Sequence, residues 1–435
     1  MSALDLTDCD SGRLNGHAHR PRSGHAERYC QVRAMTERLA RPLTPEDCCI
    51  QSTDDVSPTK WHLAHTSWFF ETFVLAKACP DYQPFHPAFA YLYNSYYLSA
   101  GERHCRPRRG LISRPSLEEV YAYRRHVDER MSALLEDQDQ AALTAAESVV
   151  ELGLNHEQQH QELMLTDIKH VFWSNPLRPA YCSRSDPAEE AAPLMRWHAF
   201  SEGLVWIGSD AETFAYDNER PRHRVLLNRF EMASRLVTNG EYIRFIEDGG
   251  YRTGTLWLSD GWNTVQTEGW EAPLYWEQRD GVWWYHTLAG MRPVNTREPV
   301  CHVSLYEADA YARWAGARLP TEAEWEAAAA GVAVKGNFVE SERFHPAPVI
   351  PDSGGPLQMF GDVWTWTGSA YLGYPGYRPP SGALGEYNGK FMCNQFVLRG
   401  GSCATPSGHV RRTYRNFFPP AARWQFTGLR LARDA

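Results

Sequence analysis

The stretch that decides the fold of this 435-residue chain is Asn155-His156-Glu157-Gln158-Gln159-His160-Gln161-Glu162. It lies within residues 145–172, which are dominated by Ala, Leu, Glu and Gln and carry apolar residues at helical period, so we predict a helix there. On a helix, His156, Gln159 and His160 share one face. Two imidazoles one turn apart are spaced to bind a single transition metal, although two solvated histidines on a polar face would give the same pattern.

The overall composition limits the class of protein. A chain of 435 residues is too long for one ordinary core and indicates two or three domains. The net charge of −9 is spread along the sequence, which argues against a nucleic-acid partner. No apolar run approaches the length that crosses a bilayer, and the polar N-terminus lacks the apolar stretch of a secretory signal. Ten cysteines without a C-x-x-C pair indicate reduced thiols, so we expect a cytoplasmic protein with no membrane partner.

Helical patterns fill the first half of the chain. They cover residues 28–40, a segment from Ser57-Pro58 to about Ala78, a segment from the capping box Ser116-x-x-Glu119 to about Gln138, and residues 145–172. A long irregular connection, residues 80–114, separates the second pattern from the third, and connections of this length are usually functional. The pattern predicts a four-helix bundle, a fold that places metals between facing helices.

The second half of the chain has a different character. Short strand patterns, many turns and most of the 16 tryptophans follow Arg196. Capping boxes at Thr238-x-x-Glu241, Ser304-x-x-Glu307 and Thr321-x-x-Glu324 predict three small helices, and Gly316 is placed to end the second. We therefore predict an α+β protein with a disordered tail (1–27), a helical bundle (28–174), a linker (175–195) and a second domain (196–435).

Together these motifs resemble a known family. The second half is similar to the formylglycine-generating-enzyme (sulfatase-modifying-factor) family, which has a C-type-lectin-like fold, and the first half resembles a DinB-type metal-binding bundle. The matching segments of the second half are residues 203–208, 237–242, 318–326, 361–367, 398–402 and 428–432. This fusion, in this order, resembles the ergothioneine-biosynthesis sulfoxide synthases. Cys393 and Cys403 do not reproduce the copper-binding cysteine pair of the formylglycine-generating branch, so the second domain is expected to be a scaffold for substrate-binding loops.

The resemblance implies a mononuclear non-haem Fe(II) bound by His65, His156 and His160. His62, one turn from His65, is the alternative ligand, and the family match favours His65. Glu162 is expected to orient a ligand imidazole. Three imidazoles on one face of an octahedral ion leave three open positions. The family fills them with the imidazole of hercynine (Nα-trimethylhistidine), a thiolate and dioxygen, and forms an imidazole C2–S bond and a sulfoxide.

The resemblance also assigns residues around the metal. Tyr96 and Tyr97 are expected to steer the reaction toward C–S coupling and away from thiol oxidation; aromatic core packing is the alternative role. Gln159 would bind the substrate imidazole and Asn416 the carboxylate side of hercynine. Phe417 and Phe418 would contact the trimethylammonium, which recognises aromatic faces because it cannot donate hydrogen bonds. The thiol's carboxylate would be bound by one of four arginines, Arg103, Arg106, Arg108 and Arg109, each of which could equally be solvated.

Other functions remain open from the sequence. A related enzyme would make selenoneine from a selenosugar, and the sulfur donor is either cysteine, which residues 94–97 and 106–110 favour, or γ-glutamylcysteine. The literal H-E-x-x-H pattern would suit a zinc metallopeptidase with Glu157 as general base. A lectin-like domain could also serve as a non-enzymatic binding module, which the three histidines argue against. The oligomeric state is not predicted.

Overall fold

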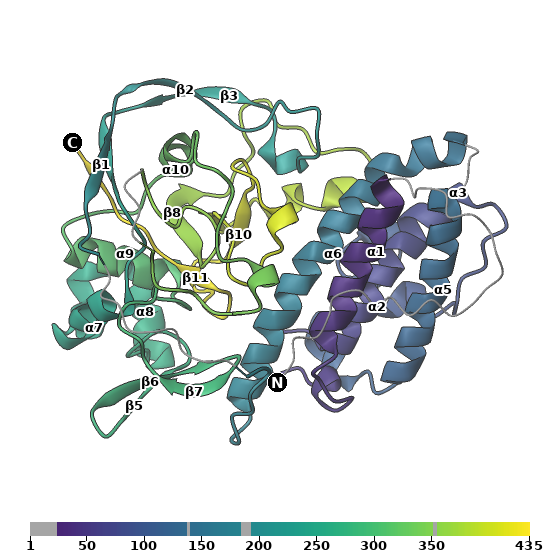
Figure 1. The fold of residues 1–435 in the computed structure, drawn as a ribbon, viewed down its shortest axis with the longest axis horizontal. Helices are drawn as coiled ribbons and strands as arrows, with labels where there is room; N and C mark the ends of the chain where they lie inside the picture. The colour runs from purple at the N-terminus through teal and green to yellow at the C-terminus, as the bar shows by residue number, and fades with distance from the viewer. Residues whose placement is uncertain (1–23, 137–139, 184–192, 351–354) are drawn as a thin grey trace, which may run out of the picture.

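Helices dominate the first half of the chain in the computed structural model, which describes residues 24–136, 140–183, 193–350 and 355–435 (Figure 1). The long helices of the bundle are α1 (Gly24–Ala40), α2 (Thr59–Phe70), α5 (Leu117–Glu136) and α6 (Gln140–Ser174). A π-helical turn (Glu71–Leu75) and the short α3 (Ala76–Ala78) extend α2. The long connection contains α4 (Phe89–Leu92) and 3-10 turns at Leu98–Ala100 and Arg106–Leu111. The predicted four-helix bundle with one long crossover is therefore confirmed.

One predicted helix start is confirmed and the other three differ; α6, predicted from residue 145, begins at Gln140. Ser116 and Glu119 form the predicted capping box, in which the Ser116 N–H donates to Glu119 Oε2 at 2.7 Å and the Glu119 N–H donates to Ser116 Oγ at 3.2 Å. Helix α1 already begins at Gly24, within the predicted tail. Helix α2 begins at Thr59 without a side-chain cap: Ser57, a residue type that favours the cap position, instead donates its backbone N–H to Asp167 and accepts from Arg109 through its hydroxyl. None of the helices in the described ranges combines the length and apolarity needed to cross a membrane.

The second half of the chain is a β-rich domain with small helices around its sheets. Its helices are α7 (Asn239–Glu247), α8 (Ser259–Glu268), α9 (Leu305–Trp314) and α10 (Glu322–Ala328). The three predicted capping boxes are present at α7, α9 and α10, and Gly316 follows α9 with a positive φ of 64°. This backbone conformation suits glycine at a helix end.

The strands form separate small sheets. In the described residues the four-stranded sheet has the order β10-β9-β8-β11, three-stranded sheets have the orders β1-β4-β12 and β5-β6-β7, and β2 pairs with β3. The strands are β1 (Trp197–Phe200), β2 (Gly203–Ile207), β3 (His223–Leu227), β4 (Phe230–Ala233), β5 (Trp276–Arg279), β6 (Val282–Thr287), β7 (Gly290–Pro293), β8 (Trp364–Ala370), β9 (Phe396–Arg399), β10 (Asn416–Phe418), β11 (Thr427–Gly428) and β12 (Ala432–Asp434). All pairs are antiparallel except β8 with β11.

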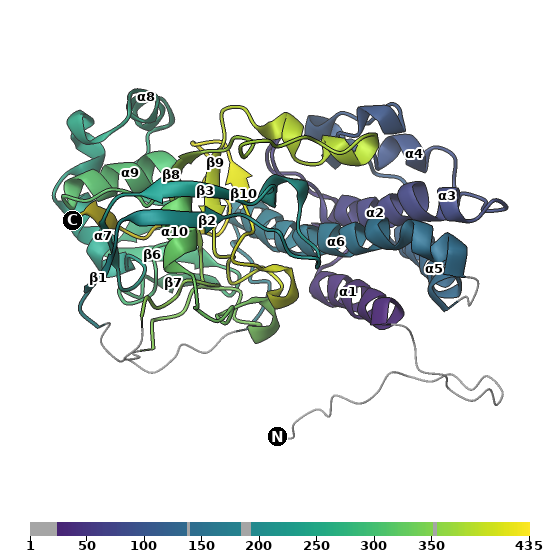
Figure 2. The ribbon, with the colours of Figure 1, turned by 90° about the horizontal axis from the view of Figure 1, so that it is seen from above.

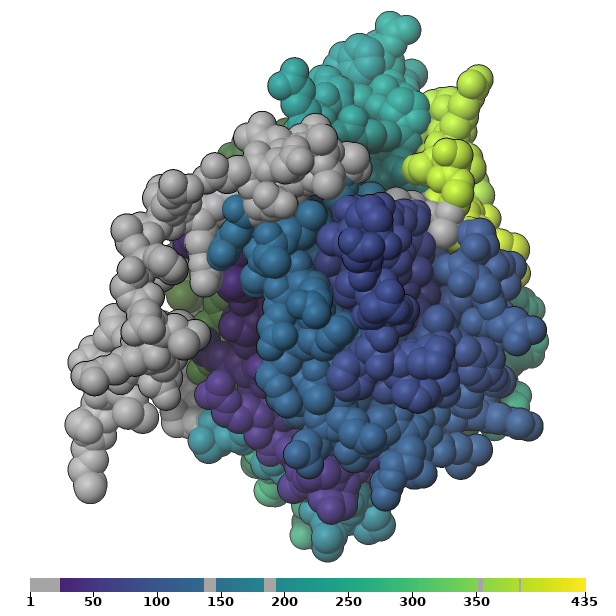
Figure 3. Space-filling view, turned by 90° about the vertical axis from the view of Figure 1, so that its right-hand side faces the viewer, coloured from purple at the N-terminus to yellow at the C-terminus, as the bar shows by residue number. Residues whose placement is uncertain are grey.

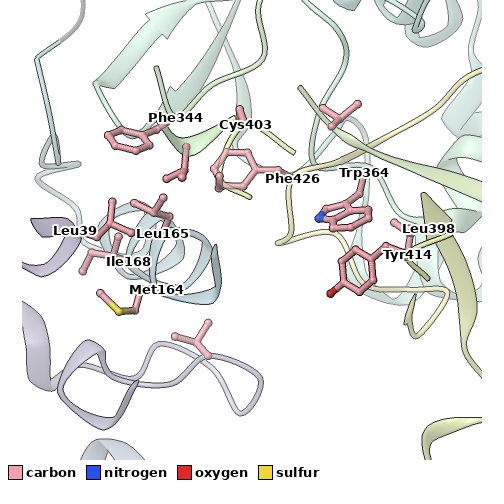
Figure 4. Close-up of a cluster of buried hydrophobic side chains, with 14 of the residues drawn as sticks. Leu39, Met164, Leu165, Ile168, Phe344, Trp364, Leu398, Cys403, Tyr414 and Phe426 are labelled. Atoms are coloured by element: carbon pink, nitrogen blue, oxygen red, sulfur yellow. The ribbon is translucent and has the colours of Figure 1, made fainter. Parts of the chain in front are cut away.

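Helix α6 joins the two halves, since it lies between the rest of the bundle and the second domain (Figure 1). Leu165 and Ile168 of α6 belong to one buried cluster with Phe344 and Phe426 of the second domain (Figure 4). Burying one such side chain stabilises the fold by roughly 1.5–3 kcal/mol. The same helix therefore carries the predicted metal motif and the contact between the domains.

A loop of the second domain also reaches the bundle. Residues 383–391, which contain two 3-10 turns, lie beside the long connection that carries α4 (Figure 2). In the space-filling view onto the bundle, yellow-green atoms of the second domain lie next to the blue surface of the first half (Figure 3). The tyrosine-bearing connection therefore contacts the second domain directly, through Leu98 and Ser99.

Candidate metal centre and substrate cavity

Three buried imidazoles from α2 and α6 converge inside the bundle. His65 Nε2 and His160 Nε2 each lie 3.1 Å from His156 Nε2, and the three ligand atoms lie within 4.8 Å of one another. Adjacent nitrogens bound at about 2.1 Å to an octahedral ion would be about 3 Å apart. The set therefore fits one face of a transition-metal ion, and the described residues bring together the predicted trio of histidines.

The electrostatics of the three imidazoles suit metal binding. Burial lowers the pKa of His65, His156 and His160, in the case of His156 to about 3. All three rings are therefore neutral near pH 7 and each has a lone pair available for a metal. The donor set of neutral nitrogens suits iron, zinc and copper alike, so the geometry defines a transition-metal centre without selecting the metal.

His65 is held firmly in place. Its Nδ1 lies 2.6 Å from the Tyr93 carbonyl oxygen, to which it donates a proton, so that Nε2 faces the other histidines. Its ring is stacked between Trp61 at 4.5 Å and Trp68 at 5.3 Å. These contacts explain why His65, and not His62, contributes the third Nε2 atom of the cluster.

His62 and Glu162 occupy other roles than those weighed from the sequence. Both nitrogens of His62 are hydrogen-bonded away from the point where the three Nε2 atoms meet, one to His160 and one to Asp167. The expectation that Glu162 orients a ligand imidazole is wrong. Its carboxylate accepts hydrogen bonds from Trp364, Ser402 and Thr405 of the second domain.

Glu157 of the H-E-x-x-H pattern does not face the metal centre. It is buried and accepts hydrogen bonds from Arg33 at 2.9 Å, Thr36 at 2.7 Å and Arg124 at 3.2 Å. Although burial alone would raise its pKa, the two guanidinium groups lower it to about 2. A carboxylate paired in this way cannot serve as the general base of a metallopeptidase, so the geometry excludes that alternative.

Three tyrosines lie close to the histidines. Tyr97 is fully buried and packs against Trp68, while Tyr96 stacks on Tyr97 with ring centroids 4.5 Å apart. The third, Tyr387, was not predicted; its ring lies 5.8 Å from that of His156, and its hydroxyl donates to Gln159. Burial raises the pKa of all three hydroxyls, so each keeps its proton.

A cavity of about 220 Å³ lies beside this centre, between the two halves of the chain. Of the predicted substrate-binding residues, five line it: Arg106, Gln159, Asn416, Phe417 and Phe418; Tyr96, which was predicted to steer the reaction, lines it as well. Tyr387 and Tyr414 also line it. Larger hollows of about 560 and 840 Å³ occur elsewhere, but their lining contains none of the predicted site residues. We therefore take the smaller cavity as the candidate substrate site.

The structure does not bring Arg103 and Arg109 to this cavity. Arg109 is buried, lies over the Trp61 ring at 3.4 Å and donates to Ser57. Arg103 is exposed and donates to the Ser95 carbonyl oxygen at 3.2 Å. Arg106 is thus the predicted arginine that borders the cavity, and it also donates to the Asp55 carbonyl oxygen at 2.5 Å.

Gln159 and Phe417 are both fixed by the second domain. The Gln159 amide donates to the Tyr414 hydroxyl at 2.7 Å and accepts from Tyr387. The Phe417 ring is stacked on Tyr371 with centroids 4.0 Å apart. Rigid placement of a polar amide and an aromatic face on one cavity wall suits recognition of a small polar cation.

Comparison with known proteins agrees with this architecture. Residues 28–164 match the model of the DinB superfamily, and residues 199–353 and 349–435 match that of the sulfatase-modifying factor enzyme 1-like domain. The chain is 34% identical to a hercynine oxygenase of Mycobacterium tuberculosis over 93% of this chain and 97% of that protein. It is 32% identical to a hercynine oxygenase of Mycolicibacterium thermoresistibile, covering 87% of this chain and 88% of that one. It is also 27% identical to ergothioneine biosynthesis protein 1 of Schizosaccharomyces pombe, over 51% of this chain and 28% of that protein.

The fold and the site therefore define a class of protein in which a DinB-type bundle with a buried histidine centre is fused to a sulfatase-modifying-factor-like domain. Within that class, the chain belongs to the hercynine oxygenase family.

Proposed function

We propose that this chain is an Fe(II)- and dioxygen-dependent sulfoxide synthase that joins C2 of the hercynine imidazole to the sulfur of cysteine. The observation that carries the proposal is the convergence of three neutral Nε2 atoms beside a cavity lined by both domains. Bound iron would hold the substrate imidazole and the thiolate next to each other and activate dioxygen. In the balanced reaction, hercynine loses its C2 hydrogen and the thiol its S–H hydrogen, one oxygen atom joins the sulfur, and the other leaves as water.

Hercynine is assigned to the wall formed by Gln159 and β10. The amide of Gln159, which precedes His160 in the sequence, would bind the substrate imidazole. Asn416 would bind the carboxylate side of hercynine. The Phe417 and Phe418 rings would contact the trimethylammonium, and such contacts are worth about 0.5–2 kcal/mol. Relatives named hercynine oxygenase support this choice of substrate.

The sulfur donor is assigned to the Arg106 side of the cavity. A guanidinium can bind a carboxylate through two parallel hydrogen bonds, and Arg106 borders the cavity. Residues 94–97 and 106–110, which resemble the segments of cysteine-using relatives, support cysteine as the donor over γ-glutamylcysteine.

The tyrosine hydroxyls would hold the protons that the reaction exchanges. Tyr96 and Tyr387 both line the cavity, whereas Tyr97 lies behind Tyr96 and accepts a hydrogen bond from it at 3.4 Å. We therefore assign the proton-holding role to Tyr96 and Tyr387 and a supporting role to Tyr97.

An assay with three donors tests the proposal. The protein is purified without oxygen, loaded with Fe(II), and given hercynine, ¹⁸O₂ and one donor in each of three parallel arms: cysteine, γ-glutamylcysteine or a selenosugar. We expect a hercynine–cysteine sulfoxide that carries one ¹⁸O, detected by mass spectrometry. If only γ-glutamylcysteine or only the selenosugar gives a coupled product, that compound is the donor instead of cysteine. The absence of a coupled product with all three donors would refute the proposed activity.

A further inference from the structure

A chain of hydrogen bonds continues from His160 away from the metal centre. His160 Nδ1 lies 2.8 Å from His62 Nδ1, and His62 Nε2 lies 2.9 Å from Asp167 Oδ2. The same carboxylate oxygen accepts the backbone N–H of Ser57 at 2.9 Å. All four residues are buried, so water does not compete for these bonds.

The direction of these bonds is fixed by chemistry. An ionised carboxylate only accepts hydrogen bonds, so His62 Nε2 must carry a proton and donate it to Asp167. With its proton on Nε2, His62 presents Nδ1 as an acceptor, and a proton on His160 Nδ1 completes the hydrogen bond between the two rings. This assignment leaves the lone pair of His160 on Nε2, which lies 3.1 Å from His156 Nε2.

We propose that His62 and Asp167 are positioning residues that fix the tautomer of His160 and aim its Nε2 at the metal, an inference that rests on the metal centre of the proposed function. Carboxylate–histidine pairs behind a ligand are a general way to orient an imidazole and raise its basicity. Here the pair acts through a second imidazole, with both nitrogens of His62 in use. His62 is therefore a support of the ligand set rather than an alternative member of it.

The three ligands differ in how they are supported. His65 donates to a backbone carbonyl, which no substitution removes, and His156 Nδ1 has no hydrogen-bond partner among the described residues. His160 alone of the three depends on a replaceable side chain, within the described part of the protein. These hydrogen bonds also connect α2, which carries His62, to α6, which carries His160 and Asp167.

Binding of Co(II) to the metal-free full-length protein tests the positioning role of His62 and Asp167. Four variants are compared with the wild type by competition against a chromophoric chelator: His62→Phe, His62→Gln, Asp167→Asn and the control Thr166→Val. Phe removes the acceptor and keeps a planar ring, whereas the Gln amide oxygen can again accept from His160. Thr166 is fully buried next to Asp167, but among the described residues its hydroxyl donates only to the Leu163 carbonyl oxygen of its own helix.

We expect His62→Phe to weaken Co(II) binding about 10- to 100-fold, the usual cost of removing such a support. His62→Gln should recover most of the loss, and Thr166→Val should bind like the wild type. In the paramagnetic NMR spectrum of the Co(II) form, His62→Phe should lose one slowly exchanging imidazole N–H signal of a ligand. A purely structural role for His62 would not remove that signal selectively.

If His62→Phe does not fold, Asp167→Asn decides the question, because it keeps the volume and removes the charged acceptor; about tenfold weaker Co(II) binding supports the positioning role. Wild-type Co(II) affinity in a folded His62→Phe or Asp167→Asn protein would overturn it. Equal losses in His62→Phe and His62→Gln would also overturn it. Because Co(II) binding needs neither hercynine nor a thiol, the result stands apart from the outcome of the sulfoxide assay.

Discussion

The Glu386 carboxylate accepts a hydrogen bond from the Ser99 hydroxyl at 2.6 Å, across the boundary between the two halves of the chain. It also accepts the backbone N–H groups of Leu98 and Ser99 at 3.0 and 2.9 Å. Lys390 pairs with Glu386 at 2.8 Å and donates to the Tyr96 carbonyl oxygen at 2.5 Å. Although partial burial would raise the pKa of Glu386, the Lys390 and Ser99 hydrogen bonds lower it to about 2, so the carboxylate is ionised at neutral pH.

This pairing fixes the segment that carries Tyr96 and Tyr97 against the loop that carries Tyr387. We expect Glu386→Ala to lower sulfoxide formation about tenfold, because poorer placement of the tyrosines that raises the barrier by about 1.4 kcal/mol slows the reaction by that factor. Iron content should stay at the wild-type level, since Glu386 does not contact the histidines.

The control is Glu340→Ala. Glu340 binds the N–H and hydroxyl of Ser407 at 2.9 Å each, which is the same chemistry at another place. Steady-state rates and iron analysis of the two variants, measured side by side, check the prediction. A similar loss of sulfoxide formation in Glu386→Ala and Glu340→Ala would show that the effect is not specific to Glu386.

The cluster of three histidines could be predicted from sequence because the spacing of its members is local. His156 and His160 share a helix face, and His65 lies in a short motif of another helix. Tyr387 and Glu386 could not be found in this way, since they lie in a loop without helical or strand period that approaches the bundle only in the folded chain. Glu162 was misassigned for the related reason that its three donors, Trp364, Ser402 and Thr405, all come from distant segments.

The ligand assignment predicts the loss of iron from three single variants. His65→Ala, His156→Ala and His160→Ala should each reduce bound iron to near background, because two imidazoles no longer define one face of the ion. His170→Ala is the matched control: His170 lies on α6, is half-buried and binds Ser52 at 2.7 Å. Metal analysis after anaerobic loading provides the measurement. Full iron occupancy in any of the three variants would remove that histidine from the ligand set.

Glu162 should matter for stability more than for metal affinity. Glu162→Ala leaves three buried donors, at 2.8, 2.5 and 2.8 Å in the intact protein, without their acceptor. An unsatisfied buried group costs roughly 1–3 kcal/mol, so we expect the free energy of unfolding to fall by about 3–5 kcal/mol. Denaturant unfolding of the metal-free protein measures this, with the partly exposed Glu151→Ala as control.

Co(II) affinity separates this role from the one predicted from sequence. A Glu162→Ala protein of normal stability that binds Co(II) 10- to 100-fold more weakly would restore the ligand-orienting role.

The aromatic wall predicts a selective effect on hercynine. Phe417→Leu keeps apolar bulk and removes the ring, so the loss of about 0.5–2 kcal/mol should raise the KM for hercynine about 2- to 30-fold. The KM for cysteine should change less than twofold. Phe200→Leu, which breaks a stacked pair with Phe230 at 4.9 Å in another sheet, controls for loss of a stacked ring. Equal changes in the two KM values would mean that the wall had collapsed.

The tyrosines provide the test that separates coupling from simple oxidation of the thiol. Once both substrates and dioxygen are present, oxygen transfer to sulfur alone competes with C–S bond formation, and a proton held close to the reacting atoms favours coupling. Phenylalanine keeps the ring and its packing and removes only the O–H, so the fold and the bound iron should survive.

We expect Tyr96→Phe and Tyr387→Phe to shift the product from the sulfoxide toward cysteine sulfinic acid while dioxygen is still consumed, because both side chains line the cavity. Tyr97→Phe should change the product ratio less, since Tyr97 is fully buried against Trp68 and Phe73 and reaches the cavity only through Tyr96. Mass spectrometry of both products, together with oxygen uptake and iron content, gives the partition for each variant. Wild-type product ratios in both Tyr96→Phe and Tyr387→Phe would assign these two residues to packing. If the product ratio instead changes most in Tyr97→Phe, then Tyr97 is the proton-holding residue and Tyr96 supports it.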